Sequence, residues 1–350
     1  MAVGFDMPLR TSTAARPVAI ARGARTNLAL LAFLTVAFFT GWLAFAYATT
    51  PARWSLVVHA AGGFAILALL PWKSMIARRG IGRPRPRRWA SALLGVLVLI
   101  SLVAGLLHST GLAVYWGPLT AMDFHVGAAI AAVPLAIWHV AERRIRVRPT
   151  DLSRRSILRA GAVIGGAAVA YAASEVIVRA TGLPGAARRF TGSYEAGSYQ
   201  PGLMPVSSWM FDAIPTIDRH AWRLTAGGRE WSYDELLAFD DRLTATLDCT
   251  GGFFSTQEWA GARLDRMIGK AEGATVRVVS VTGYNRRFPI DRASSMLLAT
   301  RFGGQALDPG HGFPARLIVP DGRGFWWVKW VSAIEVDDVP HWAQPPFPLQ

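Results

Sequence analysis

The chain has a single cysteine and few charged residues for its length. Among 350 residues, the charged share is 17% and the hydrophobic share is 52%. One cysteine excludes an internal disulfide, so Cys249 is either a small buried hydrophobic side chain or a thiol kept for its reactivity. The mean hydropathy of +0.28 excludes an ordinary soluble protein.

Four stretches in the first 140 residues contain no charged side chain. Each is about long enough to cross a bilayer core of ~30 Å at roughly 1.5 Å per residue. They run from Asn27 to Ala48, Trp54 to Trp72, Trp89 to Leu107 and Phe124 to Val140, and a fifth apolar run, from Ala160 to Val178, holds Glu175 near its end. After residue 186 no such run occurs, and the remaining chain is long enough for one globular core.

Basic residues are rare in alternate connections between these stretches. Arg and Lys cluster before residue 26, at 73–88 and at 143–159, whereas the connection at 108–123 has none and the one near residue 50 holds only Arg53. This alternation predicts a multi-pass protein of the cytoplasmic membrane whose N-terminus and basic loops face the cytoplasm. Contact with anionic membrane lipid then explains most of the net charge of +14, and we expect no nucleic-acid partner.

The sequence "SRRSILR" at 153–159 precedes a Gly/Ala-rich apolar segment and is similar to a twin-arginine export signal placed inside the chain. The alternative is a basic cytoplasmic loop beside a fifth span. Either interpretation places the C-terminal domain on the extracytoplasmic side. Ala170-Tyr171-Ala172 is a candidate cleavage site, but the segment is long enough to remain as an anchor, and we favour the anchor.

The chain is therefore predicted to have three parts. Residues 1–150 form a four-helix transmembrane domain that is a candidate for haem binding. Residues 151–185 contain the twin-arginine-like signal and a fifth transmembrane anchor, and residues 186–350 form the exported catalytic domain. The fold class expected is a multidomain membrane protein, in which an all-α transmembrane helical bundle is followed by an α+β domain.

Short strands and helices alternate in the predicted exported domain. The segment "WRLTAGG" indicates a strand and turn, and "SYDELLAF" a helix capped by Ser232 with Glu235. The segment "STQEWAGARLDRMIGKA" repeats the capping pattern with Ser255 and Glu258, which predicts another helix. Three further strands are predicted in "ATVRVVSV", "ARLIVP" and "FWWVKWVSAIEV".

The segment "CTGGFFSTQEWAGARL", residues 249–264, resembles the molybdenum-ligand loop of the sulfite oxidase family of molybdopterin enzymes. Downstream, "GYNRRFPIDRASSMLLATRFGGQALDPGHGFPARLIVPDGRGFWWVKWV" resembles that family's Tyr segment, Leu-Leu-Ala helix, His-Gly-Phe-Pro-x-Arg motif and closing Lys-Trp. The resemblance covers about residues 205–340, and its motifs occur in order. It implies a molybdopterin-dependent oxidoreductase with a sulfite-oxidase-type α+β domain.

By this resemblance, Cys249 is the protein's bond to molybdenum. A soft thiolate suits such a metal, and the pterin supplies the other sulfurs, so no second cysteine is needed. Gly251 and Gly252 would let the backbone approach the cofactor closely, and Ser255 is a further cofactor contact.

Other roles follow from the downstream motifs. Tyr284 matches the active-site tyrosine, a hydrogen-bond donor beside the metal-bound oxygen, although a tyrosine on a strand edge is the alternative. His311 and Arg316 match residues that hold the cofactor's polar head, a role that suits the planar arginine fork; a turn histidine and a surface arginine are the alternative. Lys329 and Trp330 match the closing motif, where cofactor contact and packing both remain open.

The sequence also departs from the family. Animal sulfite oxidases have an asparagine and two arginines after the cysteine stretch, whereas this chain continues with Thr250 and two glycines. Sulfite is therefore in doubt as the substrate, and a small oxo-anion or a sulfoxide-like compound is the broader expectation. Arg286, a candidate catalytic residue, and Arg287 could replace the missing arginines. The cytochrome b5 and dimerisation domains of those enzymes are missing, so electrons must leave by another route.

Histidines in the apolar stretches are candidate haem ligands. By the predicted topology, His59, His108 and His125 lie near the outer face and His139 near the inner one. Paired histidines on facing helices hold b-type haem in helical bundles, and this region loosely resembles bacterial b-type cytochromes and ferric-reductase-like domains. No second inner histidine exists, so we expect at most one haem, with His59 and His125 as iron ligands and His108 in reserve. The alternative is interfacial histidines without metal.

Three functions remain open. The first is a membrane-anchored molybdenum oxidoreductase that performs two-electron chemistry, oxygen-atom transfer above all, and exchanges electrons through a b haem or a quinone. The second is a molybdopterin enzyme whose membrane part is only an anchor and which uses a separate redox partner protein. The third, a cofactor-binding protein without catalysis, is disfavoured because Cys249, Tyr284 and His311 are all present.

Overall fold

The computed structural model describes residues 15–81, 88–116, 119–142, 153–208 and 212–344. The chain divides into two compact units that alternate along the sequence. One unit contains the chain up to Phe39, Val58–Leu106 and Phe124–Ala180, and the other contains Thr40–Val57, Leu107–Asp123 and the chain from Thr181 onward.

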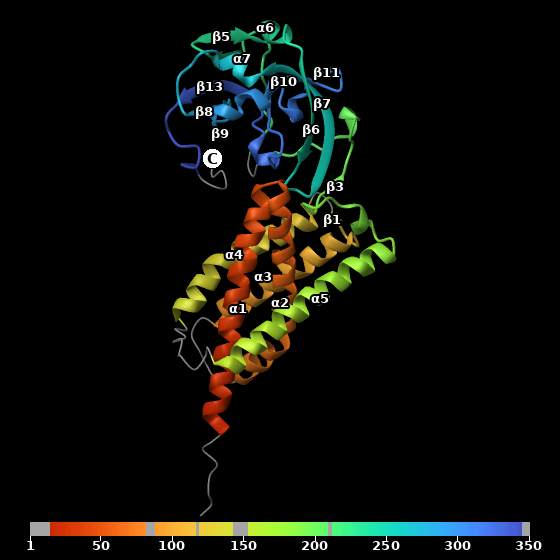
Figure 1. Cartoon of the computed structure of the whole chain (residues 1–350), viewed down its shortest axis with the longest axis vertical. Coiled ribbons are helices and arrows are strands. Elements are labelled where there is room, and N and C mark those ends of the chain that lie inside the picture. The colour runs from red at the N-terminus through yellow and green to blue at the C-terminus, as the bar shows by residue number, and fades with distance from the viewer. Residues whose placement is uncertain (1–14, 82–87, 117–118, 143–152, 209–211, 345–350) are drawn as a thin grey trace, which may run out of the picture. The chain divides into compact units, whose positions relative to one another are not determined.

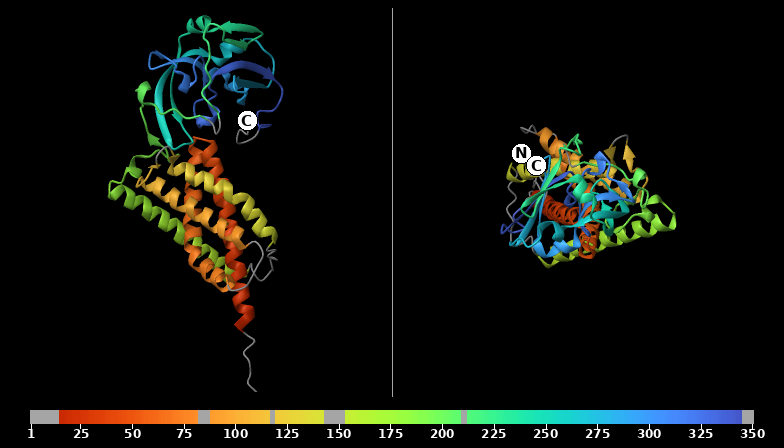
Figure 2. Two further views of the ribbon diagram at one scale, coloured as in Figure 1. Left: turned by 180° about the vertical axis from the view of Figure 1, so that it is seen from behind. Right: turned by 90° about the horizontal axis from the view of Figure 1, so that it is seen from above.

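Five long helices dominate the first half of the chain (Figures 1 and 2). They are α1 (Ala15–Ala46), α2 (Thr50–Ile81), α3 (Arg88–Thr110), α4 (Ala121–Glu142) and α5 (Arg154–Ala180). Each contains a segment of at least 22 residues that is apolar enough to cross a membrane. The five predicted apolar stretches are therefore confirmed as helices of membrane-spanning length and composition.

The first unit has few fully buried side chains. Leu30, Ile66 and Leu69 form a small buried cluster. Large apolar residues elsewhere on the helices are exposed, among them Ile137 at 66% and Val169 at 69%. Helices that expose this much apolar surface are suited to a lipid environment rather than to water.

The second unit contains two β-sheets. One is six-stranded, with the path β11-β10-β7-β3, β12 paired to β10 and β6 paired to β7; the other has the order β5-β4-β13-β8-β9. The strands of the first sheet are β3 (Tyr194–Glu195), β6 (Asp241–Asp248), β7 (Phe253–Arg263), β10 (Leu297–Phe302), β11 (Gln305–Ala306) and β12 (Arg316–Ile318). Those of the second are β4 (Arg223–Ala226), β5 (Arg229–Ser232), β8 (Thr275–Ser280), β9 (Asn285–Pro289) and β13 (Val331–Asp337).

Short helices and one hairpin complete this unit. The helices are α6 (Tyr233–Leu237) and α7 (Leu264–Ile268), and the hairpin is formed by β1 (Tyr115–Trp116) and β2 (Leu119–Thr120). A single core of buried residues, including Trp259, Leu298 and Val328, contacts both sheets. The combination of short helices with mostly antiparallel strands confirms the mixed α and β character predicted for the C-terminal part.

Several local predictions are confirmed and others are wrong. The strand in "WRLTAGG" is β4, and α6 begins with the predicted capping box, in which Ser232 Oγ accepts from the Glu235 amide at 3.2 Å. The helix predicted from Ser255 is instead the long strand β7, paired with β6 over eight positions. Glu258 does not cap: it binds Arg242 across the strands at 2.7 Å, while Ser255 is buried. Cross-strand pairing outweighs the local capping pattern here.

Two further predictions need correction. The Leu-Leu-Ala segment expected as a helix is the buried strand β10, which pairs with β7 on one side and β12 on the other. The strand predicted from "FWWVKWV" begins only at Val331, because Gly324–Trp326 forms a 3-10 turn and Trp330 has a left-handed φ of 53°. Both segments are uniformly apolar, and periodicity alone does not assign such runs to one structure.

Candidate functional site

Cys249 lies in the four-residue turn that joins β6 to β7. Its amide donates to the Phe253 carbonyl at 2.8 Å, and its own carbonyl accepts from the Gly252 amide at 3.1 Å. The side chain is 6% exposed, and Sγ contacts Ser207 Oγ at 3.3 Å and the Gly251 amide at 3.4 Å. The single cysteine is thus a buried thiol on a tightly hydrogen-bonded loop.

The two glycines of this loop differ in why they are needed. Gly252 has a φ of +94°, which side chains with a Cβ rarely adopt, and a Cβ there would lie 2.8 Å from His108 Cε1. At Gly251 the nearest atom to an added Cβ is Cys249 Sγ, at 3.6 Å. Ser255 is fully buried and accepts from Gln257 Nε2 at 2.9 Å. The predicted cofactor contacts of these three residues stay predictions.

The buried His311 pairs with the partly exposed Asp308 in the second unit. His311 Nδ1 lies 2.6 Å from Asp308 Oδ2, and Nε2 lies 3.1 Å from the Met204 carbonyl. Both partners are acceptors, so a ring nitrogen that bonds to either of them must carry a hydrogen. Burial by itself would raise the pKa of Asp308, but hydrogen bonds from His311 outweigh it and the pKa is lowered.

Arg316 is buried rather than on the surface. It is 2% exposed, donates from Nη1 to the His311 carbonyl at 3.1 Å, and lies 5.6 Å from the rings of Trp259 and Trp327. Its Nε has no hydrogen-bond partner among the described residues. Burial lowers the pKa of Arg316 to about 10, against the opposing electrostatic effects of Cys249 and Asp308. The surface interpretation of this arginine is therefore wrong.

Lys329 and Trp330 have different roles: Lys329 makes polar contacts, and Trp330 is packed in the interior. Lys329 Nζ donates to the Ser207 carbonyl at 2.6 Å and to the Gly310 carbonyl. Burial, followed by the nearby Arg316 cation, lowers the pKa of Lys329 to about 7. Trp330 is buried, and its Nε1 donates to the Pro309 carbonyl at 2.8 Å. Lys329 is thus a buried amine close to Arg316, whereas Trp330 holds the 309–311 turn.

Tyr284 and Arg286 are both buried beside the 324–326 turn. The Tyr284 hydroxyl donates to the Phe325 carbonyl, and burial raises the pKa of this phenol, so it is a proton donor at neutral pH. Arg286 is fully buried with its guanidinium 4.5 Å from the Trp326 ring centroid, and burial lowers its pKa. Arg287 instead pairs with Asp337 and donates to Thr275 Oγ1 at 3.0 Å, so it has a structural partner.

Sequence reasoning missed two residues of this region. Ser207 contacts the Cys249 thiol directly, and Asp212 is close enough to Lys329 and Tyr284 for their charges to influence one another. Burial raises the pKa of Asp212, against the opposing effects of a Thr282 hydrogen bond and the Lys329 cation. Both residues come from the irregular Ser/Pro-rich lead into the domain, where no motif marks them.

The first unit brings His59 and His125 together. Their rings lie 5.5 Å apart between centroids in an edge arrangement. His59 Nδ1 lies 2.7 Å from the Ala37 carbonyl, and His125 Nδ1 lies 2.7 Å from the Ser101 carbonyl. His125 Nδ1 also lies 3.2 Å from Ser101 Oγ, so the carbonyl and the hydroxyl of one serine both contact it. Each Nδ1 can act as donor, which leaves Nε2 as the atom able to bind a metal.

His108 and His139 have other partners. His108 belongs to the second unit, where it is 3% exposed and its Nε2 lies 2.9 Å from the Gly192 carbonyl. The nitrogen that a haem ligand would need is therefore engaged with the main chain. His139 Nδ1 lies 3.0 Å from Ser91 Oγ.

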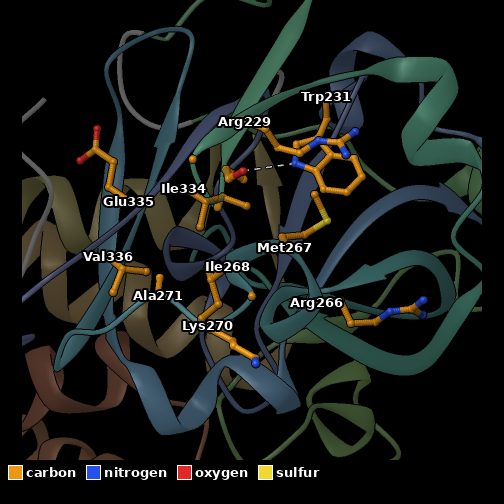
Figure 3. Close-up of a pocket in the computed structure, with 14 residues that line it drawn as sticks. Arg229, Trp231, Arg266, Met267, Ile268, Lys270, Ala271, Ile334, Glu335 and Val336 are labelled. Carbon is orange, nitrogen blue, oxygen red and sulfur yellow. Dashed lines mark hydrogen bonds between the residues drawn. The ribbon is translucent and has the colours of Figure 1, made fainter.

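A surface pocket of about 670 Å³ lies elsewhere in the second unit (Figure 3). It is lined by the β4–β5 turn, α7 and β13, and Trp231 Nε1 donates to the Ala226 carbonyl at 3.2 Å beside it. None of the site residues predicted from the sequence lines this pocket. The pocket lining therefore does not include Cys249, Arg316 or Lys329.

Comparison with known proteins places the second unit in context. Residues 211–344 match the family described as "Oxidoreductase molybdopterin binding domain". Mitochondrial sulfite oxidase of Mus musculus is 29% identical over 177 residues, covering 37% of this chain and 32% of that protein. The NADPH nitrate reductase of Mycosarcoma maydis is 42% identical over 57 residues, covering 16% of this chain and 6% of that enzyme.

Among solved structures, the sulfane dehydrogenase SoxCD from Paracoccus pantotrophus is 24% identical, with a TM-score of 0.34 over 36% of this chain and 40% of that one. The chain spans about a third of the length of the sulfite oxidases it matches. Residues 211–344 are therefore similar to molybdopterin-binding domains of oxidoreductases.

Proposed function

We propose that this protein is a membrane-anchored molybdenum-cofactor oxidoreductase whose catalytic domain lies on the extracytoplasmic side. The observation that carries the proposal is the buried Cys249 thiol near two buried cations, Arg316 and Lys329, inside the segment that matches molybdopterin-binding domains. Cys249 would be the single protein ligand of the metal.

The residues present fit such a cofactor. Arg316 has a buried Nε without a hydrogen-bond partner among the described residues, and Lys329 has a pKa lowered by burial, so an anionic group beside them would satisfy both. The described residues form no cluster of three or more His, Cys, Asp or Glu able to hold a metal. The observed side chains suit a metal that takes one thiolate from the protein and its other ligands from a pterin.

The chain's own residues would divide the work around the cofactor. When bound, a molybdenum cofactor supplies two-electron redox chemistry and oxygen-atom transfer. Arg316, Lys329 and His311 would hold its anionic part, and Tyr284 would donate a hydrogen bond from its phenol to the substrate. Arg286, buried against Trp326, would attract a small anionic substrate. The sulfite oxidase and nitrate reductase relatives favour a small oxo-anion, with sulfoxide-like compounds as the other candidates.

We further propose a b haem in the first unit, held by His59 and His125. Both Nδ1 atoms are engaged with helix carbonyls, which orients the rings and leaves Nε2 for iron. The rings are in edge contact at 5.5 Å, so iron binding would require them to move apart. A quinone or this haem would then exchange electrons with the catalytic domain. If no haem binds, the second candidate is favoured. In that case the membrane part only anchors the enzyme, and a separate redox partner protein carries the electrons.

The proposed location rests on the five helices and on the charge pattern. The helix α5 continues without interruption through Ala170-Tyr171-Ala172, which supports a retained anchor over a cleaved signal. Arg154 and Arg155 begin this helix and would act as the twin-arginine signal that exports the folded domain through the cytoplasmic membrane.

One experiment tests both cofactor proposals. Detergent-purified protein should contain molybdenum and pterin in near-equal amounts, and its spectrum should show a b-type band on reduction with dithionite. Turnover would then be measured with sulfite, sulfoxides and nitrate. Protein without molybdenum would overturn the oxidoreductase proposal, and molybdenum without the reduced band would favour the anchor with a separate redox partner.

A further inference from the structure

Asp248, directly before Cys249, is a completely buried carboxylate with several donors. Its Oδ2 accepts from Thr191 Oγ1 at 2.7 Å and from Arg189 Nη1 at 3.1 Å, and its Oδ1 accepts from Ser193 Oγ at 2.6 Å. A buried charge is tolerated only when it is paired and hydrogen-bonded, and here every partner is in place. The network fixes the end of strand β6 where the thiol loop begins.

Arg323 connects this carboxylate to the cysteine itself. Its Nη1 lies 3.5 Å from Asp248 Oδ1, and its Nη2 donates to the Cys249 carbonyl at 3.0 Å. Asp248 and Arg323 also form an isolated parallel β-bridge, and Arg323 is only 3% exposed. The rigid guanidinium fork thus contacts the charge before the cysteine and the carbonyl of the cysteine at the same time.

The Cys249 backbone is held from three directions. Its amide donates to the Phe253 carbonyl, and its carbonyl accepts from the Gly252 amide and from Arg323. The preceding side chain accepts three hydrogen bonds and forms an ion pair with Arg323. With the main chain fixed, the position of Sγ depends on a single rotatable bond with a few staggered positions. A neutral buried cysteine would need none of these restraints.

We propose that Asp248 and Arg323 are positioning residues that hold the Cys249 loop so that the thiolate meets molybdenum in one direction. This inference rests on the proposed function, since only a metal ligand gives that rigidity catalytic value. Groups that orient a metal's ligands have large effects on affinity and activity although they never contact the metal. Asp248 lies directly before the segment that resembles the molybdenum-ligand loop, and Arg323 lies between the His-Gly-Phe-Pro-x-Arg and Lys-Trp motifs without belonging to either.

The variants Asp248→Asn and Arg323→Lys in the full-length protein test the proposal. In Asp248→Asn, an N–H₂ group replaces one acceptor oxygen and faces the donors that bind the carboxylate in the parent protein. In Arg323→Lys, the side chain has no planar fork with which to contact two acceptors at once. Asp240→Asn is the matched control, because Asp240 also contacts two arginines, Arg242 and Arg301, but is largely exposed.

Two readouts separate positioning from general stability. In cofactor-free protein, iodoacetamide alkylation reports on Cys249 alone, because the chain has no other cysteine. We expect alkylation to be about tenfold or more faster in both variants than in the parent, because each variant loses a buried charge-assisted hydrogen bond. Hydrogen exchange in peptides covering 247–256 should also be faster. In loaded protein we expect a changed Mo(V) paramagnetic resonance spectrum. Asp240→Asn should match the parent in all three measurements.

The outcomes distinguish this inference from the function on which it rests. Unchanged alkylation and exchange in both folded variants would overturn the positioning role, even if the parent holds molybdenum. If alkylation is accelerated in the variants but the parent protein never binds molybdenum, the proposed function is overturned. The role of Asp248 and Arg323 in holding the Cys249 loop is then still supported. If Asp248→Asn does not fold, Thr191→Val removes one hydrogen bond of the same carboxylate, and unchanged alkylation in that variant and in Arg323→Lys would equally overturn the role.

Discussion

The two compact units pair their polar side chains in different ways. In the first unit, His59 and His125 bond to main-chain carbonyls, and large apolar side chains such as Val169 stay exposed. In the second, Arg286 and Arg316 are buried among aromatic rings. Burying a guanidinium requires compensation by hydrogen bonds, ring faces or an anion, and only a folded core with many different side chains supplies these.

This difference indicates what each unit can bind. Two imidazoles with engaged Nδ1 atoms offer neutral nitrogen ligands to a metal. A thiol beside buried cations offers one soft ligand together with a site for an anion. If the comparison holds, changes in one unit should affect one cofactor and leave the other in place.

The largest effect is expected from Cys249→Ser. A hydroxyl is a harder and less acidic ligand than a thiol, so molybdenum content and turnover should fall by more than the ~10–100-fold typical of changes outside the ligand sphere. Thr250→Ser, in the same turn, should retain both. Metal analysis and turnover measure the loss, and circular dichroism should show the parent's fold. Parental turnover in Cys249→Ser would remove the central claim, and loss of the b-type band in it would break the separation of the two units.

The histidine pair gives the next largest effect, confined to the first unit. His125→Ala should abolish the dithionite-reduced band, and His59→Ala should abolish or shift it, whereas His139→Ala should leave it intact. Two glycines of α3 sharpen the test: a Cβ at Gly105 would lie 2.9 Å from His125 Nδ1, but one at Gly95 meets no described atom within 4 Å. Gly105→Ala should therefore weaken or shift the band and Gly95→Ala should not. A band lost only in His139→Ala would invert the assignment.

A topological prediction concerns the boundary between the two parts of the sequence. Replacing Arg154 and Arg155 with Lys keeps the charge but removes the receptor-read pair, so the catalytic domain should remain on the cytoplasmic side. Protease added to spheroplasts would measure this, since only an exported domain is cut. The same change at Arg143 and Arg144 is the control. If the domain is cut as readily in the Arg154/Arg155 variant, the pair is only a positively charged flank.

The smallest effect is a pH dependence of stability in cofactor-free protein. Burial lowers the pKa of Lys329 from 10.5 to about 7, so between these values the unfolded chain binds more protons than the folded one. The free energy of unfolding should therefore rise with pH over this interval and lose this contribution as pH falls towards 7. Lys329→Met should flatten the rise, as followed by thermal unfolding at pH 7, 8 and 9. Equal slopes in parent and variant would show that Lys329 is charged in the folded protein.

The sequence was most informative where patterns are local or long. Four charge-free runs and a fifth apolar run with one glutamate predicted five helices, because crossing a bilayer imposes a length and a composition that few other structures share. The Ser232 capping box also held, because both of its hydrogen bonds form within one turn. The same pattern failed at Ser255 and Glu258, where pairing with β6 put alternate side chains on opposite faces of a strand. A capping pattern is local and contains no information about a partner strand that is distant in the chain.

For the candidate site, the family resemblance pointed to Cys249, Tyr284, His311, Arg316 and Lys329, and the structure shows all five buried or largely buried. Asp212 and Ser207 escaped notice because they precede the motifs in an irregular segment. Arg287 appeared equivalent to Arg286 in the sequence, yet alternation along β9 sends one into the core and the other to Asp337.

The sequence by itself determined the number and composition of the apolar helices, the single thiol and the set of basic and phenolic groups that follow it. Those properties belong to residues, and covalent order preserves them. The tertiary structure decided which histidines face each other, which arginines are buried and that Asp248 and Arg323 enclose the Cys249 backbone. These are relations between segments tens of residues apart, and they exist only because strand pairing and core packing select one arrangement from the many that the same local patterns allow.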